Sequence, residues 1–516
     1  MSEYRLHVFD KEGKKKEFIF GSGQSLYQVL RKNNMYVNSV CGGTGRCKKC
    51  KVQFLSGATP PHLSDRETFT DEELEQGYRL ACKSYPSENC SIYLDFPSAQ
   101  VVLTIPGETD ENCDMFHKRE AADHYGLAVD IGTTTIAYAL VNLQSTKEEN
   151  FYSQLNLQQQ YGADVISRIQ KANEGELVNL KECITKQLTE GIYYFLSETC
   201  QLDRIVISAN TAMVHLLMGY SCEGLGAYPF REIYTDMIST ATDTLLFMKE
   251  KIPITIMPGI SAFIGGDILS GIAFLSLGKE EKRELFIDLG TNAEMALCDG
   301  KGHILVTSAA AGPAFEGGNI SCGTGSVPGA VCHAKMMENG LSVSTIRKDF
   351  PVGICGSGLL DIIFELKKAN IIDETGLFIE QFFETGYPVC EGINKKMIYI
   401  TQNDVREFQY AKSAIRTAIE ILLERSGLIY DELDHVYLAG AFGTFMNFEK
   451  AAGVGLFPEK WRDKIEIVGN TSLLGAVGYL TKANEREVYN LKDSCQEIYI
   501  ANEASFQEKY LRYMYL

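Results

Sequence analysis

The sequence predicts a multidomain protein of mixed α+β and α/β class, with a small N-terminal sheet domain followed by two duplicated α/β lobes. Three observations lead to this prediction. The 516 residues exceed what one hydrophobic core usually organises. The first hundred residues alternate like short strands around a cysteine-rich loop. An apolar strand, an Asp-x-Gly-Thr turn and a second strand then occur twice, beginning at residues 126 and 284.

These patterns place the domain boundaries. We expect a first domain over residues 1–100, a linker over 101–125, a first lobe over 126–283 and a second lobe over 284–516. The linker is acidic and polar, and it ends abruptly at the apolar run that starts with Gly126.

Composition excludes several classes of protein. The hydrophobic fraction of 45% and charged fraction of 22% are ordinary for a soluble globular chain. No apolar run approaches the roughly 20 residues that span a bilayer, and the first residues lack the regions of a signal peptide. Fifteen scattered cysteines indicate a reducing compartment rather than disulfides. We therefore expect a cytoplasmic protein with no membrane contact.

The net charge of −18 lies almost entirely after residue 100. Residues 1–100 hold 14 basic and 12 acidic side chains, a balance of +2, which leaves −20 for the remainder. Nucleic acid is not an expected partner of so acidic a body. Basic residues beside the cysteine loop could steer an acidic protein partner, or they could simply form a solvated loop that offsets a negative group.

The first domain is predicted to be a small β-grasp-like sheet. Residues 4–9 and 16–20 alternate like strands around a hairpin turn, and a short helix starts at Ser25. A strand and turn follow at 52–57, then a polar loop and helix at 64–74. A last strand begins at Ser91.

Four cysteines of this domain predict a metal cluster: Cys41, Cys47, Cys50 and Cys82. Three thiolates spaced C-x5-C-x2-C on a glycine-rich loop, with a fourth from a later turn, are typical of a [2Fe–2S] cluster in ferredoxin-like domains. Zinc is the main alternative, although zinc sites usually take cysteines as two short pairs. Burial as small apolar residues fits poorly among glycines and lysines. The other cysteines, among them Cys390, have no ligand-like spacing and are interpreted as packing residues.

The two repeated turns predict a phosphate-binding cleft. A glycine hairpin can grip phosphate oxygens with its amides and hydroxyls, while Asp130 and Asp288 can hold a hydrated Mg²⁺. One such turn is weak evidence, but facing hairpins could clamp a nucleotide between two lobes. The alternative is an α/β protein with fortuitous glycine turns. The candidate phosphate-binding residues are Gly132, Thr133, Thr134, Gly290, Thr291 and Asn292.

A third glycine-rich turn agrees with the repeat. A helix over 411–425 leads to a strand from Asp434 and the turn Gly440-Ala441-Phe-Gly443, and a further strand from Ile465 opens a small-residue helix. This set of motifs resembles the superfamily of acetate and sugar kinases, heat-shock chaperones and actin. The resemblance implies an actin-like fold of two lobes around an ATP cleft.

Further candidates lie between these motifs. Asn210 ends a strand, and Asp267 lies at the start of a helix. In the resembled superfamily that helix carries the group that orients water at the γ-phosphate, so Asp267 is the candidate for this role; a helix cap is the alternative. Gly312, Gly356 and Ser357 belong to glycine-rich loops at helix starts, which suit backbone contact with a ligand.

A ferredoxin-like domain fused to such an ATPase closely resembles the reductive activators of corrinoid-dependent methyltransferase systems. The resemblance rests on the cysteine loop, Tyr161-Gly-Ala-Asp-Val-Ile-Ser-Arg-Ile, Asn210-Thr-Ala-Met, Ala311-Gly-Pro-Ala-Phe-Glu-Gly and Gly353-Ile-Cys-Gly-Ser-Gly-Leu. It implies ATP-dependent transfer of one electron to a Co(II) corrinoid protein, a low-potential electron donor and a homodimer formed through the ATPase body. Since only about 25 residues separate the two halves, the separate middle domain of some members is not expected here.

Two other functions remain open at the level of sequence. A small-molecule kinase with a redox-sensing cluster would place the phosphate in a substrate, and its carboxylate base cannot be located from the sequence. A ferredoxin tethered to an actin-like docking scaffold would transfer electrons without turning over ATP.

Overall fold

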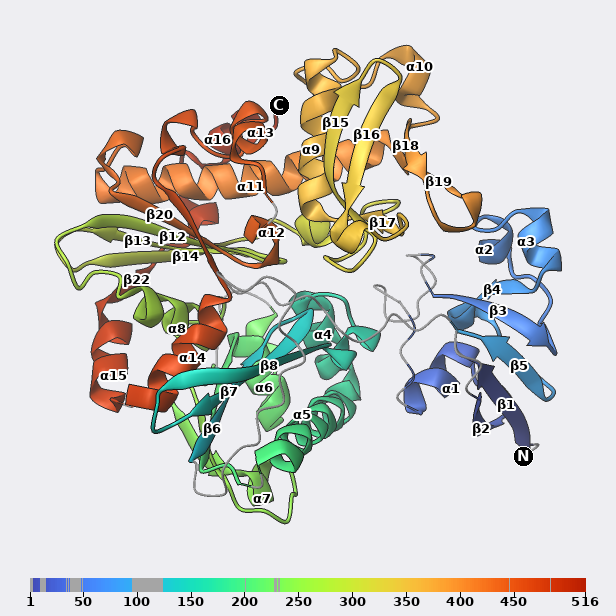
Figure 1. Ribbon diagram of the computed structural model, residues 1–516, viewed down its shortest axis with the longest axis horizontal. Coiled ribbons are helices and arrows are strands. Elements are labelled where there is room, and N and C mark those ends of the chain that lie inside the picture. Colours follow the sequence, from blue (N-terminus) through green and yellow to red (C-terminus); the bar gives the residue numbers. More distant parts are fainter. Residues whose placement is uncertain are drawn as a thin grey trace.

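The computed structural model describes residues 3–9, 15–33, 35, 37, 48, 50–94, 124–199, 201–226, 230, 233–444, 446–482 and 484–516. Figure 1 shows a small N-terminal module beside a larger body built on two sheets. The body contains two six-stranded sheets. We call the sheet formed by the earlier part of the body, with its connected helices, lobe 1, and the sheet formed by the later part, with its connected elements, lobe 2.

The module is a five-stranded sheet with the order β2-β1-β5-β3-β4. Strand β1 pairs antiparallel with β2 and parallel with β5, which is the arrangement predicted for a β-grasp sheet. Leu6, Leu30 and Ile92 are fully buried in its core. The elements are β1 (Glu3–Phe9), β2 (Lys15–Gly21), α1 (Leu26–Lys32), β3 (Lys51–Ser56), α2 (Leu63–Arg66), α3 (Asp71–Glu75), β4 (Tyr78–Leu80) and β5 (Cys90–Tyr93). The predicted turn at 11–14 lies outside the described residues.

Lobe 1 is a mixed sheet with the order β10-β11-β9-β6-β7-β8. Its centre is apolar on both faces, as expected for strands covered by helices on both sides. The elements are β6 (Tyr125–Ile131), β7 (Thr135–Asn142), β8 (Lys147–Leu155), α4 (Val165–Lys171), α5 (Leu177–Thr199), β9 (Arg204–Ala209), α6 (Thr211–Met218), β10 (Ile238–Ala241), α7 (Thr242–Leu245), β11 (Pro253–Ile256) and α8 (Gly266–Leu275).

Lobe 2 repeats this plan with the order β21-β20-β12-β13-β14-β22 and adds a three-stranded and a two-stranded sheet. Its elements are β12 (Arg283–Leu289), β13 (Ala293–Asp299), β14 (Ile304–Ala309), β15 (Ala330–Met337), β16 (Gly340–Thr345), β17 (Gly353–Ile354), α9 (Gly356–Lys368), α10 (Glu380–Phe383), β18 (Tyr387–Glu391), β19 (Met397–Ile400), α11 (Gln402–Ser426), β20 (His435–Ala439), α12 (Ala441–Thr444), α13 (Phe448–Gly453), β21 (Ile465–Gly469), α14 (Thr471–Lys482), α15 (Glu485–Ser494), β22 (Cys495–Glu497) and α16 (Phe506–Arg512).

In both lobes the first two strands form the predicted hairpin. In lobe 1, β6 pairs antiparallel with β7 and parallel with β9. In lobe 2, β12 pairs antiparallel with β13 and parallel with β20. The internal repeat of the sequence is therefore a structural repeat, and the duplicated fold is confirmed.

Helices α8 and α14 lie between the two sheets (Figure 1). They meet backbone to backbone, because a Cβ built on Gly475 would lie 2.1 Å from the carbonyl oxygen of Ser270. Helix α14 also packs on lobe 1, where Ala476 and Leu480 join a core with Val206. The first residues of α14 therefore face groups from both lobes. Among the described residues, no helix is both long enough and apolar enough to cross a bilayer.

The C-terminal chain is fastened to α11 by a buried lysine. Lys412 is 1% exposed, and its amine donates to the carbonyl oxygens of Val454, at 3.0 Å, and Tyr515. The pKa of Lys412 is lowered to about 7, mainly by burial and in smaller part by the positive charges of Lys367 and Arg416. No carboxylate pairs with this amine among the described residues.

We expect Lys412→Met to remove a pH dependence of folding stability. The unfolded lysine binds its proton up to about pH 10.5, whereas the folded one releases it near pH 7. The wild-type protein should therefore gain stability as the pH rises from about 7 to 10.5, and this gain should be missing in the variant. The variant should also lose about 1–3 kcal/mol at high pH, because two carbonyls lose their donor. Urea unfolding at pH 7 and pH 9.5 measures both effects, and parallel pH profiles would contradict them.

Candidate functional site

A cavity of about 230 Å³ lies between the lobes, where the two repeated hairpins face each other. It collects most of the residues predicted to bind a nucleotide: Asp130, Gly132, Thr133, Thr134, Asn210, Asp267, Asp288, Gly290, Thr291, Asn292 and Gly440. The topology explains the convergence, because each hairpin follows the carboxyl end of a central strand and the two sheets point these ends toward each other.

Asp130, at the end of β6, is held by hydrogen bonds from residues at the start of α14. Its two carboxylate oxygens accept hydrogen bonds from Asn470 Nδ2 at 2.9 Å and from Ser472 Oγ at 2.7 Å. Burial raises the pKa of Asp130, while these two hydrogen bonds lower it. The carboxylate is thus oriented before any ligand arrives, and it links lobe 1 to the start of α14.

Asp267 and Asp288 lie in the same cavity. The pKa of each carboxyl is raised to about 7, mainly by burial, and the charge of the neighbouring Asp130 contributes to both shifts. The helix-cap alternative for Asp267 is confirmed in part. Gly265 occupies the N-cap position of α8, but Asp267 accepts the first-turn backbone N–H of Ile268 at 2.9 Å and also contributes to the wall of the cavity. These carboxyls share one small volume, so a bound cation would lower their pKa values together.

Asn210 has two contacts that fix the first hairpin against α6. Its side-chain oxygen caps the helix by accepting the N–H of Met213 at 2.9 Å, and its amide donates to Thr133 Oγ1 at 3.4 Å. It therefore faces the cavity, as the sequence predicted, while also serving as a structural cap.

Gly440 allows β20 to approach the second hairpin closely. Its φ is +89°, and a Cβ at this position would lie 2.5 Å from the carbonyl oxygen of Leu289 and 3.1 Å from Asp288 Oδ1. A larger residue would push β20 away from the aspartate. Ala441 and Gly443 lie in α12, immediately after this turn, and Gly443 is not among the described residues that line the cavity.

Three other predicted ligand-contact residues also lie outside the cavity: Gly312, Gly356 and Ser357. A Cβ on Gly356 would lie 2.0 Å from the carbonyl oxygen of Phe315, so this glycine serves close packing of α9 on the turn before it. Ser357 is buried, and its hydroxyl lies 3.3 Å from Cys355 Sγ. Gly312, at φ +78°, starts the 3₁₀ turn η5 (Pro313–Glu316). These small residues position η5 and do not contact the cavity themselves.

Glu316, at the end of that turn, was missed by the sequence interpretation. One of its carboxylate oxygens accepts hydrogen bonds from Thr291 Oγ1 and, at 3.4 Å, from Thr134 Oγ1, so it bridges both hairpins. Burial raises its pKa, whereas the two threonines and Arg168 lower it. The motif Ala-Gly-Pro-Ala-Phe-Glu-Gly contains this carboxylate, but only its glycines were interpreted as ligand contacts. Glu294, bonded to Ser308 at 2.9 Å, also lines the cavity and was missed.

Replacing Glu316 by alanine should lower kcat/KM for ATP hydrolysis about ten- to hundredfold, because two hydrogen bonds to a charged group disappear and the hairpins lose their bridge. Glu316→Gln keeps an oxygen acceptor and should lose less. Steady-state kinetics of both variants test this expectation. Equal, wild-type activity in both would show that the bridge has no part in turnover.

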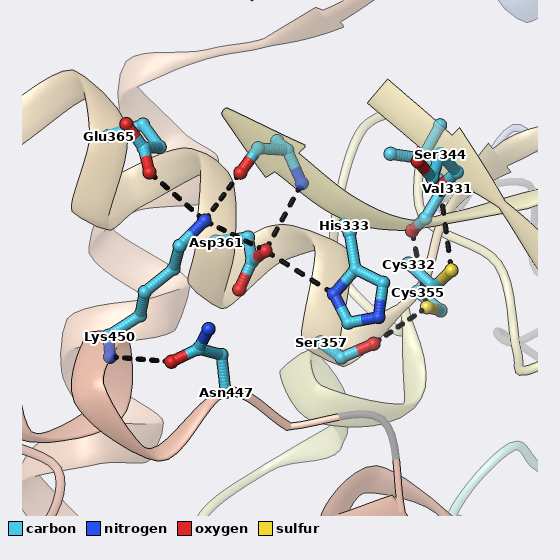
Figure 2. Close-up of polar contacts among 11 residues, drawn as sticks. Val331, Cys332, His333, Ser344, Cys355, Ser357, Asp361, Glu365, Asn447 and Lys450 are labelled. Carbon is cyan, nitrogen blue, oxygen red and sulfur yellow. Dashed lines mark hydrogen bonds and ion pairs between the residues drawn. The ribbon is translucent and has the colours of Figure 1, made fainter. Parts of the chain in front are cut away.

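A second polar network joins α13, α9 and β15 (Figure 2). Lys450, on α13, lies 2.9 Å from Asp361 Oδ2 and 3.0 Å from Glu365 Oε1, both on α9. Asp361 is 1% exposed and also accepts the N–H of Ala334 on β15 at 3.1 Å. The network connects the chain that follows Gly440 with the helix that supports η5.

The donor set of the cavity fits Mg²⁺. All its charged groups are carboxylates, and hard oxygen donors are what this ion prefers. Within the described residues, no three His, Cys, Asp or Glu side chains converge as a complete metal cage. That is the expected arrangement for Mg²⁺, which usually takes one or two carboxylates together with water and phosphate oxygens.

The structure describes two of the four predicted cluster ligands. Cys50 and Cys82 are buried, and their Sγ atoms lie 3.2 Å apart, close enough for both to reach one iron. Cys82 lies in the 3₁₀ turn η1 (Ala81–Lys83), whose Ala81 N–H donates to the carbonyl oxygen of Cys50 at 2.8 Å. Cys41 and Cys47 lie outside the described residues. The positions of the Cys50 and Cys82 thiols fit two ligands of an iron–sulfur cluster.

Comparison with known families assigns all three bodies. Residues 9–87 match the 2Fe-2S iron-sulfur cluster binding domain, residues 125–280 match the RACo middle region, and residues 282–516 match the C-terminal domain of RACo, the ASKHA domain. The middle region is therefore present as lobe 1, and the expectation that a middle domain would be missing was wrong.

Individual relatives extend along nearly the whole chain. The corrinoid activation enzyme RamQ of Eubacterium limosum is 33% identical over 92% of this chain and 93% of its own. The [Co(II) methylated amine-specific corrinoid protein] reductase of Methanosarcina barkeri is 27% identical over 75% of this chain and 76% of its own. Among solved structures, a reductive activator for corrinoid, iron-sulfur protein matches 99% of this chain and 98% of its own with a TM-score of 0.69 at 25% identity.

Proposed function

Because this chain belongs to the family of reductive activators of corrinoid proteins, we propose that it passes one electron to an inactive Co(II) corrinoid protein in an ATP-dependent step and so restores Co(I) for methyl transfer. The observation that carries the proposal is the 33% identity to a corrinoid activation enzyme along 92% of the chain. Two buried thiols in the module and a cavity with two facing hairpins in the body support it.

The four cysteines would hold a [2Fe–2S] cluster, which supplies one-electron chemistry, near −400 mV in plant-type ferredoxins. A low-potential donor loses the electron, and Co(II) gains it to become Co(I). Because reduction to Co(I) is uphill for such a donor, the nucleotide must favour a state of the complex in which transfer occurs. Only differential binding to two states can do so.

The cavity residues would hold Mg²⁺ and ATP. Asp130 and Asp288 orient a hydrated Mg²⁺, and the hairpins at 132–134 and 290–292 bind the phosphates. Asp267 orients water at the γ-phosphate. The cavity carboxylates would repel the polyphosphate without this cation. The turn at Gly440, which would contact the nucleoside, lies against Asp288 because Gly440 has no Cβ. We also propose a homodimer through the ATPase body, which the mass of the protein in solution tests.

The proposal is tested by the visible spectrum of a Co(II) corrinoid protein mixed with the full-length protein and a strong reductant. We expect Co(I) with Mg-ATP and little without it, together with release of inorganic phosphate. Phosphate that appears in a small-molecule acceptor would instead favour a kinase. Full reduction without nucleotide would contradict the ATP dependence.

A further inference from the structure

The motif Tyr161-Gly-Ala-Asp-Val-Ile-Ser-Arg is part of a segment, residues 156–168, that holds the backbone of the first phosphate hairpin. We call it the bridging segment. Asn156 Nδ2 donates to the carbonyl oxygen of Gly132 at 2.9 Å, and Arg168 Nη2 donates to that of Thr133 at 2.5 Å. The carbonyl oxygen of Thr134 accepts from the backbone N–H of Asn156 at 2.9 Å and from Gln159 Nε2 at 3.0 Å. Three consecutive carbonyls of the hairpin thus depend on this one segment.

Arg168 shows how firmly the segment is fixed. Its guanidinium is fully buried, and it also donates through Nε to the carbonyl oxygen of Gly162 at 2.9 Å. A Cβ on Gly162 would lie 2.3 Å from Ser167 Oγ, so the turn closes tightly on the start of α4. A displacement of the hairpin must therefore be passed on to the segment.

The opposite side of the bridging segment contacts the N-terminal module. Tyr27, 3% exposed on α1, donates its hydroxyl to the carbonyl oxygen of Gln160, which is itself buried. The start of α1 is bonded to the cluster-ligand turn, because Leu26 N–H donates to the carbonyl oxygen of Ser84 at 2.8 Å, two residues after Cys82. A continuous series of contacts thus joins a cluster ligand to the phosphate hairpin.

The module also contacts lobe 2. Lys396, immediately before β19, lies 3.4 Å from Glu73 on α3, and Figure 1 shows α2 and α3 beside β19. Burial is the largest cause of the lowered pKa of Lys51, and the positive charge of Lys396 acts in the same direction. The same charge helps to lower the pKa of Glu73 against the opposite effect of burial. The module therefore rests on both lobes at once. A change in the separation of the lobes cannot preserve both contacts.

We propose that the bridging segment is a docking surface for the chain's own ferredoxin-like module, and that docking there and nucleotide binding in the cavity oppose each other. The inference rests on the proposed nucleotide site. Phosphates between the hairpins change their relative position, the segment follows the first hairpin, and the contact with Tyr27 is lost. The module, with its cluster-ligand turn freed from the body, can then approach a partner protein. Linkage requires that undocking the module tightens nucleotide binding by the same factor.

The test uses Tyr27→Phe in the full-length protein, because this change keeps the ring and removes only the donor. Calorimetry with Mg²⁺ and a non-hydrolysable ATP analogue should give an affinity about three- to tenfold higher than that of the wild type. Tyr85→Phe, an exposed tyrosine of the same module, is the matched control and should bind like the wild type. Lys396→Gln should also tighten binding, whereas Lys395→Gln should not.

Hydrogen exchange gives a second readout on the same samples. In the wild type, adding the analogue should increase exchange in residues 24–30 and 157–162 together. In Tyr27→Phe, both segments should already exchange fast without the analogue. If both Tyr27→Phe and Lys396→Gln bind the analogue with wild-type affinity, and exchange in the two segments does not change, the linkage is wrong while the proposed nucleotide site is unaffected. Failure of the analogue to bind any form of the protein would overturn the nucleotide site itself and the inference with it.

Discussion

Replacing Cys82 by serine should abolish electron transfer and leave ATP hydrolysis intact. The buried Cys82 thiol lies 3.2 Å from that of Cys50, so its loss removes one of the four proposed ligands of the cluster. The proposed nucleotide cavity lies between the two lobes and should not change. Iron and acid-labile sulfide analysis should give about two of each per wild-type chain and substoichiometric amounts for the variant.

Cys390→Ser is the matched control for this experiment. Cys390 lies on β18 of lobe 2, outside the module that holds Cys50 and Cys82, and burial raises the pKa of its thiol to about 11, so the free thiol stays protonated at neutral pH. Its iron content should equal that of the wild type. Stoichiometric zinc without acid-labile sulfide in protein prepared anaerobically would show that the cysteines form a zinc site instead.

Asp288→Ala should lower ATP turnover by about two orders of magnitude or more. The variant loses a carboxylate that the cavity offers to Mg²⁺, and a metal contact to a phosphoryl oxygen is worth several kcal/mol in the transition state. Asp130→Ala should have a similar effect, since it also releases Asn470 and Ser472. Steady-state phosphate release measures the rates, and iron content should stay unchanged in both variants.

The loss should depend on pH. Because the pKa of Asp288 is raised to about 7, the wild-type carboxyl is mostly protonated at pH 6 and mostly ionised at pH 8. Mg²⁺ binding requires the ionised form, so wild-type turnover at limiting Mg²⁺ should rise across this range, and it should rise less steeply in the variant, which keeps only the Asp267 carboxyl with a pKa of about 7. Asp493→Ala, at an exposed position of α15, should behave like the wild type. Unaltered hydrolysis in both cavity variants would mean that the repeated turns do not bind the nucleotide.

The fold was largely predictable because its strands carry local signals. The two Asp-x-Gly-Thr turns are short and rest on apolar strands, and both became antiparallel hairpins at the carboxyl ends of parallel neighbours. Asp130 and Asp288 meet in one cavity for this reason, and Asp267 joins them from the start of α8. Alternation and turns also predicted most strands of the module, but not β4 or the order in which the strands pair.

Other parts of the site depend on contacts between distant segments, which one sequence does not display. Glu316 meets Thr134 across 182 residues, and Asn470 meets Asp130 across 340. Gly356 illustrates the opposite error. A glycine at a helix start can serve a ligand or close packing, and here the carbonyl of Phe315 occupies the space that its missing side chain leaves.

The central claim is that the module and the ATPase body must act together in one polypeptide. The most direct measurement is the visible spectrum of a Co(II) corrinoid protein mixed with reductant and either the intact chain, a chain that begins at His124, or the 1–100 fragment. We expect extensive Co(I) formation only with the intact chain and Mg-ATP. The chain from His124 should bind the nucleotide without delivering electrons, and the fragment should accept an electron yet leave Co(II) largely unreduced. Full Co(I) formation by the fragment alone, with or without ATP, would contradict the account.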